Sequence, residues 1–282
     1  MLRFFKTRLL ILAVFLCGFF ILLLYFGASA QHPGVPVLNY HQINDVDENV
    51  LTVSTPEFET QMRYLKENGY TSISPYEYID HLRNGTPLPE KPVILAFDDG
   101  YKDNAVNAVP ILQKYGMKGT IFIVTDFLDR FDNYISWADA RALERDGTLI
   151  VESHTMSHSD LSKLSEEEIR HEFIGSRLAI YDKLGKWSAF IAYPGGKVDE
   201  RIPRLAQEAG FYAGFTVRFG LSDPAENLYL LDRIPVFGCI DHSFLRFRIR
   251  LLYAPLCARL EEFRLWGRAH GLTDFVNSLP IP

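Results

Sequence analysis

The sequence predicts an α/β fold: a distorted (β/α)7-8 barrel of parallel strands with an N-terminal transmembrane helix. The chain has 282 residues and is 48% hydrophobic, enough for one large core. From about residue 35 to residue 236, short apolar runs alternate with amphipathic segments, as in repeated β–α units. Polar motifs follow several of these runs, at the strand ends where β/α barrels carry their active sites.

The N-terminus has the features of a membrane-targeting segment. Three basic residues precede the apolar run at positions 9–28: Arg3, Lys6 and Arg8. About 20 apolar residues can cross a bilayer as a helix, and the flanking positive charges predict export of the rest of the chain. Ala28-Ser29-Ala30 offers a cleavage site. We expect residues 1–30 to be a signal anchor or signal peptide, and the rest of the chain to be extracytoplasmic at the cell membrane, or secreted after cleavage behind Ala30.

Strands are expected where short runs are apolar and bounded by turn residues. The run at 92–97 is apolar throughout, as in a strand covered on both faces. The expected strands are 35–40, 71–74, 92–97, 119–124, 148–151, 188–192, 212–217 and 229–236.

Helices are expected between these strands, because the intervening segments are amphipathic and carry start and stop signals. Ser54 or Thr55 can cap the first helix, and Ser165 with Glu168 forms a capping-box pattern. Glycines such as Gly116 follow the predicted ends. The expected helices are 56–68, 76–83, 104–115, 137–145, 165–184 and 200–209.

Two polar motifs predict a metal site. Asp98 and Asp99 follow the strand at 92–97, and His154 and His158 follow the strand at 148–151. Asp-His-His with open positions is typical of a catalytic metal site rather than a structural one. The remaining carboxylate could then accept a proton from an attacking water.

Three motifs resemble those of the polysaccharide deacetylases, the NodB-homology domain of carbohydrate esterase family 4. They stand in the family's order over about residues 35–240: Phe97-Asp98-Asp99-Gly100, His154-Thr155-Met156-Ser157-His158 and Ala192-Tyr193-Pro194-Gly195-Gly196. The resemblance implies a hydrolase acting on carbon–nitrogen bonds, which removes N-acetyl groups from glycans and releases acetate.

The resemblance also implies roles for individual residues. Asp98 is the expected catalytic base, and the backbone N–H of Tyr193 is the expected oxyanion donor. The expected metal ligands are Asp99, His154 and His158, and the metal is Zn²⁺, with Co²⁺ or another divalent ion as alternatives. Tyr101, Pro194 and Gly195 are expected to contact the substrate.

The general acid departs from the usual family pattern. The common form carries a histidine in a Leu-x-His motif near the end of the domain, and residues 230–237 have none. His41 instead follows the first strand, as in the permuted branch that includes poly-N-acetylglucosamine deacetylases. His41 is therefore our expected acid, with His242 as the alternative.

The residues that orient the catalytic base also depart from the family pattern. The family's third motif usually carries an arginine where this chain has Ala192, and its Asp-x-x-Asp-Trp motif has no clear match. Asp232-Arg233 or Asp160 could supply an equivalent ion pair.

Composition limits the partners. The net charge of -6, without a basic stripe through the middle of the chain, argues against nucleic acid. Residues 31–243 form the expected catalytic domain, and residues 244–282 a basic amphipathic tail that could contact a membrane surface or a protein. Cys239 and Cys257 could pair or remain free thiols.

Two functions remain open from the sequence. The first is an extracytoplasmic metal-dependent N-deacetylase acting on N-acetylglucosamine-containing exopolysaccharide or peptidoglycan. The alternative is a catalytically weak polysaccharide-binding or export accessory protein on the same fold. The paired aspartates and both histidines favour the enzyme, since a binding module has no need of a base beside a metal.

Overall fold

The computed structural model describes residue 18, residues 34–223 and residues 227–278. The chain divides into Met1–Gly34 and a compact unit, Val35–Pro282, which contains the barrel. The signal anchor or signal peptide predicted for residues 1–30 lies outside the described residues, apart from residue 18. Within the described ranges, no helix has both the length and the apolar character needed to cross a bilayer.

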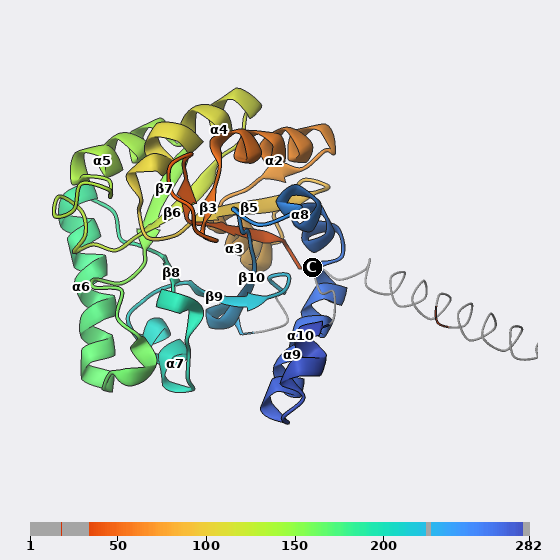
Figure 1. Cartoon of the computed structure of the whole chain (residues 1–282). Helices are drawn as coiled ribbons and strands as arrows, with labels where there is room; N and C mark the ends of the chain where they lie inside the picture. The colour runs from red at the N-terminus through yellow and green to blue at the C-terminus, as the bar shows by residue number, and fades with distance from the viewer. Residues whose placement is uncertain (1–17, 19–33, 224–226, 279–282) are drawn as a thin grey trace, which may run out of the picture. The chain divides into compact units, whose positions relative to one another are not determined.

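Parallel strands close into a barrel, as predicted (Figure 1). The first barrel strand, β1, pairs with the last one, β10, on one side and with β5 on the other, so that Leu38 lies opposite both Ile234 and Leu95. The barrel strands of the described chain are β1 (Val37–Tyr40), β5 (Pro92–Phe97), β6 (Gly119–Ile123), β7 (Leu149–Ser153), β8 (Phe190–Ala192), β9 (Ala213–Phe219) and β10 (Leu231–Pro235). Their C-terminal ends meet at one end of the barrel.

Three short strands lie outside this ring. β4 (Thr71–Ser72) pairs with the first residues of β5. β2 (Gln42–Ile43) and β3 (Thr52–Val53) form a separate parallel pair. β4 lies within the strand expected at 71–74, whereas β2 and β3 were not expected, because two residues carry too little periodicity to mark a strand.

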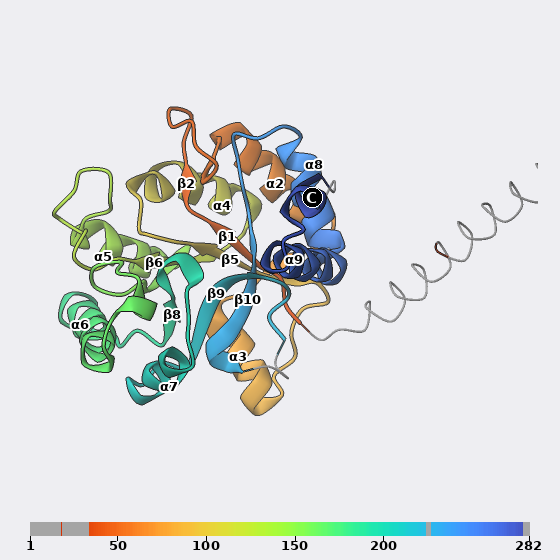
Figure 2. The same cartoon turned by 60° about the horizontal axis from the view of Figure 1, so that its bottom comes forward.

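Helices surround the strands (Figure 2) and lie close to the expected ranges. Ser165 and Glu168 form the predicted capping box. The helix expected at 104–115 begins instead with a π-helical turn, η1 (Asn104–Ala108). The helices of the barrel are α2 (Thr55–Glu67), α3 (Pro75–Asn84), α4 (Val109–Tyr115), α5 (Trp137–Asp146), α6 (Glu166–Leu184) and α7 (Arg201–Glu208).

The barrel strands are buried along nearly their whole length. Aromatic rings fill part of the core: the ring of Tyr40 stacks on Phe97 with centroids 5.4 Å apart and meets the edge of Phe58 at 5.2 Å. Burial of such side chains is the main source of stability. The C-terminal strand ends differ, because buried polar side chains gather there, Asp98 and Arg233 among them.

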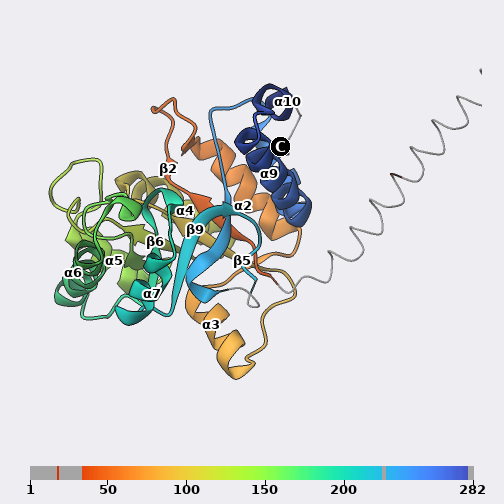
Figure 3. The ribbon, with the colours of Figure 1, turned by 90° about the horizontal axis from the view of Figure 1, so that it is seen from below.

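The C-terminal helices pack partly on the barrel. They are α8 (Ser243–Leu252), α9 (Ala254–Ala269) and α10 (Thr273–Ser278), and Figure 3 shows α9 and α10 on the side that carries α2. α8 packs on α2, where the Tyr64 ring contacts Phe244 and Phe247. Phe263 and Trp266 on α9 remain exposed. Cys239 is an exposed free thiol and Cys257 a buried one.

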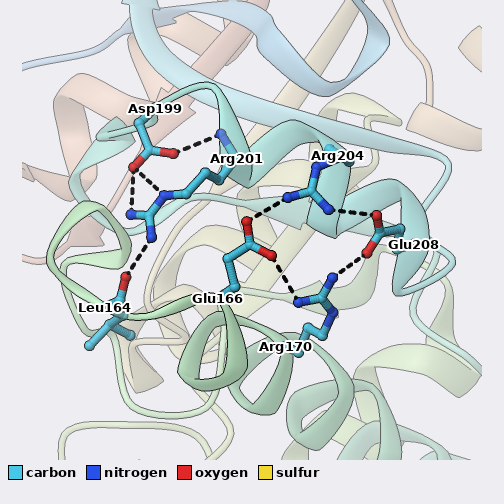
Figure 4. Close-up of polar contacts among 7 residues, drawn as sticks. All are labelled: Leu164, Glu166, Arg170, Asp199, Arg201, Arg204 and Glu208. Atoms are coloured by element: carbon cyan, nitrogen blue, oxygen red, sulfur yellow. Dashed lines mark hydrogen bonds and ion pairs between the residues drawn. The ribbon is translucent and has the colours of Figure 1, made fainter.

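A closed ring of four charged side chains joins α6 to α7 (Figure 4). Arg170 pairs with Glu166 at 3.2 Å and with Glu208 at 2.7 Å, and Arg204 pairs with the same two glutamates at 2.6 and 2.8 Å. All four side chains are well exposed, so each pair alone contributes little. As a closed set they fix the spacing of the helices that flank β8.

Candidate active site

The predicted polar residues converge because adjacent strands end together. Asp98 and Asp99 directly follow β5, and the N–H of Asp98 still donates to the carbonyl of Tyr40 on β1, at 2.9 Å. The N–H of His154, after β7, donates in the same way to Ile123 on β6, at 2.8 Å. Strand pairing therefore continues into the motifs and aligns them at one edge.

Asp99, His154 and His158 form a compact three-residue cluster. The Nε2 atoms of both histidines lie 3.3 Å from Oδ1 of Asp99, and one ligand atom from each residue lies within 4.8 Å of the others. Residues 154–158 form a loop rather than a helix. Thr155 (φ 69°) and His158 (φ 60°) take left-handed conformations, which turn the second imidazole back to the first.

The cluster fits a divalent cation. Nδ1 of His154 lies 2.7 Å from the carbonyl oxygen of Ala192. Because a carbonyl only accepts, Nδ1 carries the hydrogen, and in the neutral ring Nε2 presents a lone pair to Asp99. Oδ1 of Asp99 is buried and receives no aligned hydrogen bond within the described part of the chain. Two facing acceptors need a positive charge between them, and Asp-His-His is a donor set that divalent metals use.

Without such an ion, the opposite charges of Asp99 and the two histidines set the protonation of the cluster. Burial would raise the pKa of Asp99, but His154 and His158 outweigh it and lower that pKa. Burial would lower the pKa of His154, yet the carboxylates of Asp98 and Asp99 outweigh it and raise that pKa. The cluster thus stabilises a bound proton as it would a cation.

Helix α6 holds the loop that carries the two histidines. The carboxylate of Glu172 accepts hydrogen bonds from the N–H groups of Met156 and Ser157, at 2.9 and 3.0 Å, and from the Ser157 hydroxyl at 2.5 Å. One turn along, a Cβ on Gly175 would lie 2.0 Å from Sδ of Met156. Left-handed conformations cost about 1–2 kcal/mol each for non-glycine residues, and these contacts offset that cost.

A buried arginine orients Asp98. Nη1 and Nη2 of Arg233, on β10, each lie 2.8 Å from one carboxylate oxygen of Asp98. Nε of Arg233 donates to the carbonyl of Thr216 at 2.6 Å, and the arginine side chain is fully buried. This bidentate geometry is the strongest form of the pair and fixes the plane of the carboxylate.

Arg233 therefore supplies the arginine beside Asp98 that the third motif, with Ala192 at that position, does not provide. Of the candidates named from the sequence, Asp232 pairs with Arg218 at 2.5 Å and Asp160 with Lys197 at 2.8 Å. Burial would raise the pKa of Asp98, but Arg233, together with the neighbouring histidines, outweighs it and lowers that pKa. Asp98 is thus ionised at neutral pH although it is buried.

His41 lies beside Asp98. Its Nε2 atom is 4.0 Å from Oδ2 of Asp98, and its Nδ1 atom is buried without a hydrogen-bond partner in the described structure. The carboxylates of Asp98 and Asp99 favour the charged ring, but burial opposes them. Burial outweighs Asp98 and Asp99 and lowers the pKa of His41. His242 is exposed at the start of α8, and no hydrogen bond or ion pair to Asp98 or Asp99 is found for it in the described chain.

The third motif requires a correction. The N–H of Tyr193 donates to the carbonyl of Phe215 at 3.0 Å, so it is not free to stabilise an oxyanion. The Tyr193 side chain is buried, and its hydroxyl donates to the carbonyl of Tyr229 at 3.0 Å. Pro194 is buried as well, whereas Gly195 is exposed at φ 60°. Gly195 is therefore the exposed backbone position of this turn.

Several buried polar atoms at this end of the barrel lack partners within the described ranges. They include Oδ1 of Asn39, both polar atoms of Asn104 and Oγ1 of Thr125. Such atoms normally bind water or a ligand. Tyr101, expected to contact substrate, is half-buried, and burial followed by the charge of Asp99 raises its pKa.

Removing Arg233 should destabilise the protein in a pH-dependent way. In Arg233→Met, Asp98 stays buried without its partner, which typically costs about 3–5 kcal/mol. Because the native pKa of Asp98 is lowered, the pair stabilises the wild type above the unfolded value of about 3.9 and loses its effect as pH falls through the native pKa. The deficit in the free energy of unfolding should thus be largest at neutral pH and shrink on acidification, as measured by denaturant titration. Arg145→Met, which removes an exposed arginine of α5, is the control and should show a small deficit.

Changing Glu172 should loosen the histidine loop. Glu172→Gln removes the negative charge from the acceptor of two backbone N–H groups and puts an NH₂ group opposite the Ser157 hydroxyl, and each lost charge-assisted hydrogen bond costs about 1.5–3 kcal/mol. Affinity for Zn²⁺ should fall about 10–100-fold, as for other groups that orient ligands, and calorimetric titration measures it. Glu168→Gln, at the exposed cap of the same helix, should bind the metal as the wild type does; an equal loss there would refute a specific role for Glu172.

Comparison with known proteins agrees with this geometry. The family model described as polysaccharide deacetylase matches residues 85–214. The chain is 32% identical over 202 residues to YxkH of Bacillus subtilis (strain 168), which is named for the polysaccharide deacetylases, covering 72% of this chain and 71% of that protein. It is 29% identical over 196 residues to the poly-beta-1,6-N-acetyl-D-glucosamine N-deacetylase of Staphylococcus aureus (strain MSSA476), covering 65% and 67% of the two chains.

A solved structure is similar over nearly its whole length. The Streptococcus pyogenes deacetylase PplD in complex with acetate superimposes with a TM-score of 0.71 at 25% identity, covering 77% of this chain and 98% of that chain. Fold, motif order and the relatives together identify the chain as a member of the polysaccharide deacetylase family, and thus as a deacetylase that hydrolyses carbon–nitrogen bonds.

Proposed function

We propose that this protein is an extracytoplasmic, metal-dependent N-deacetylase that removes acetyl groups from the N-acetylglucosamine units of a polysaccharide. The observation that carries the proposal is the pairing of two carboxylates with different environments. Asp99 faces His154 and His158 at 3.3 Å, while Asp98 is held by Arg233 at 2.8 Å. One carboxylate is placed to bind a cation and the other to accept a proton, as amide hydrolysis requires.

Each residue then has a distinct task. Asp99, His154 and His158 would hold the divalent metal, most simply Zn²⁺, which when bound polarises an amide carbonyl and acidifies water. Asp98, ionised and fixed by Arg233, accepts the proton of the attacking water. The N–H of Gly195, an exposed residue of the third motif, would donate to the developing oxyanion, an interaction worth about 2.7–4 kcal/mol in other hydrolases.

His41 is the proposed proton donor to the leaving amine. An amine departs poorly unless it is protonated. The lowered pKa makes the protonated His41 ring a stronger acid. Its Nε2 atom lies 4.0 Å from Oδ2 of Asp98. The two groups are thus close enough to act on one amide, Asp98 on the attacking water and His41 on the departing nitrogen.

The glycan we favour is an exopolysaccharide of the poly-N-acetylglucosamine type, with peptidoglycan as the second choice. Two features support this choice. The Staphylococcus aureus relative is named for poly-beta-1,6-N-acetyl-D-glucosamine. In addition, His41 follows the first strand and lies beside Asp98, in agreement with the permuted arrangement.

We further propose that the apolar segment at residues 9–28 attaches the enzyme to the cell membrane with its barrel outside. The C-terminal helices are consistent with a second contact. Residues 246–268 contain six arginines and two acidic residues. Exposed Phe263, Leu265 and Trp266 lie among them. Such a basic, apolar surface suits an anionic membrane interface.

Replacing Asp98 and Asp99 one at a time tests which carboxylate accepts the proton and which binds the metal. Asp98→Asn should lower acetate release from an N-acetylglucosamine oligomer about 10²–10⁴-fold and keep stoichiometric Zn²⁺. Asp99→Asn should lose both activity and metal. Acetate assays paired with metal analysis, after chelation and Zn²⁺ add-back, measure the outcome. Metal loss from Asp98→Asn would reverse the two roles. Oligomer binding by the wild type without acetate release would instead favour a binding protein.

The role of His41 is tested by the leaving group. His41→Ala should slow hydrolysis of an N-acetyl sugar far more than hydrolysis of an activated aryl acetate, because an aryl oxide departs without a proton. Rates on the two substrates give the selectivity directly. His242→Ala, at an exposed site, should leave both rates close to the wild type. Equal losses on both substrates in His41→Ala would indicate a packing role.

A further inference from the structure

The loop between β6 and α5, residues 124–136, is built onto the candidate active site. The N–H groups of residues 124–126 donate in turn to the carbonyl oxygens of Asp99, Thr155 and Met156, at 3.4, 3.2 and 3.0 Å. The beginning of the loop is therefore attached to both metal-binding motifs at once.

The far end of the loop returns to the same place. The N–H of Ile135 donates to Gly100 at 2.9 Å, and the N–H of Lys102 donates to Asn133 at 2.9 Å. Tyr101 and Tyr134 form an antiparallel β-bridge between these bonds. With both ends fixed to residues 99–102 and 155–156, the loop forms a wall of the site.

This wall carries four contacting aromatic rings, which we call the aromatic wall: Tyr101, Phe127, Phe131 and Tyr134. Tyr101 stacks on Tyr134, with centroids 4.9 Å apart and planes at 22°. Phe127 meets Tyr134 at 4.9 Å and Phe131 at 5.3 Å. The series runs from Tyr101, two residues after Asp99, to Phe131, whose side chain is 42% exposed.

The hydrophobic core does not account for these rings. None of the four belongs to the clusters of buried apolar residues found in the described chain, although Leu128 and Ile135 of the same loop do. The loop thus buries its aliphatic side chains and presents its aromatic ones. Arg130 lies 5.2 Å over the Phe131 ring.

We propose that the aromatic wall is a glycan subsite that binds the sugar unit next to the one being deacetylated. The inference rests on the proposed function, because a polymer that places one N-acetyl group at Asp98 and Asp99 must run onward over the surrounding surface. A pyranose ring has apolar C–H faces, which pack on aromatic rings while its hydroxyls remain in water. The wall is continuous with the metal-binding residues and reaches solvent at Phe131.

The test compares substrates of different length. Wild-type enzyme should show a higher kcat/KM for an N-acetylglucosamine tetramer than for the monomer. In Phe131→Ala, KM for the tetramer should rise about tenfold with kcat kept within about twofold, typical of losing one aromatic contact. The advantage of the tetramer over the monomer should shrink accordingly, and Phe131→Trp should restore it.

The matched control is Trp187→Ala. Trp187 is 48% exposed and stacks on Tyr181 at 4.5 Å. It precedes β8 and so lies at the opposite end of the barrel. This variant should keep the wild-type KM for the tetramer. An unchanged KM in Phe131→Ala, or an equal rise in Trp187→Ala, would overturn the proposal.

Failure of the subsite can be told apart from failure of the proposed function. If the wild type releases no acetate from any N-acetylated oligomer, the proposed function fails, and calorimetric binding of the tetramer then decides the subsite. Binding that is weakened about tenfold in Phe131→Ala and retained in Trp187→Ala would support the aromatic wall on its own. Absence of tetramer binding to the wild type would reject it.

Discussion

The buried pair of Asp98 and Arg233 is the interaction on which the arrangement of this protein depends. A carboxylate with 2% side-chain exposure and a guanidinium with none must satisfy one another, since either alone would be left uncompensated. Asp98 follows β5 and Arg233 lies in β10, and β1 pairs with both strands. The pair therefore forms only when the strand ring is closed, and it links the chemistry at the rim to the integrity of the barrel.

The remaining elements of the site satisfy buried polar groups in the same way. The carbonyl of Ala192 selects the tautomer of His154, and the carboxylate of Glu172 collects the N–H groups of the histidine loop. Left-handed residues at Asp99, Thr155 and His158 are tolerated because neighbouring elements fix them. Rigid support of this kind keeps facing donor atoms at a spacing that a cation can bridge.

Much of this could be predicted from local pattern. Apolar runs and helix caps located the barrel strands and the helices around them, because burial and capping act within a few residues. The predicted convergence of Asp99, His154 and His158 needed only the rule that parallel strands end together.

Long-range partners could not be predicted in this way. The destination of Arg233 depends on which strand lies beside which, and residues 135 apart leave no periodic trace of their contact. In the sequence, Glu172 is one of several polar residues of a predicted helix. Its hydrogen bonds to the histidine loop become apparent only in the structure, where α6 lies against that loop. The engagement of the Tyr193 N–H with Phe215 is a matter of strand register, which the motif letters do not encode. The aromatic wall likewise depends on the path of the loop at residues 124–136, which returns to residues 99–102 through contacts that the sequence does not reveal.

Closure of the ring by β1 and β10 has a consequence for how the chain matures. The three proposed metal ligands are all present by residue 158, but the partner of Asp98 comes at residue 233, near the end of the barrel. Contacts of such high sequence separation form late in folding. A nascent or truncated chain that stops before β10 leaves the carboxylate of Asp98 without the arginine that orients it. Placement of the carboxylate that we propose as the base is therefore complete only after the last barrel strand has been made and paired.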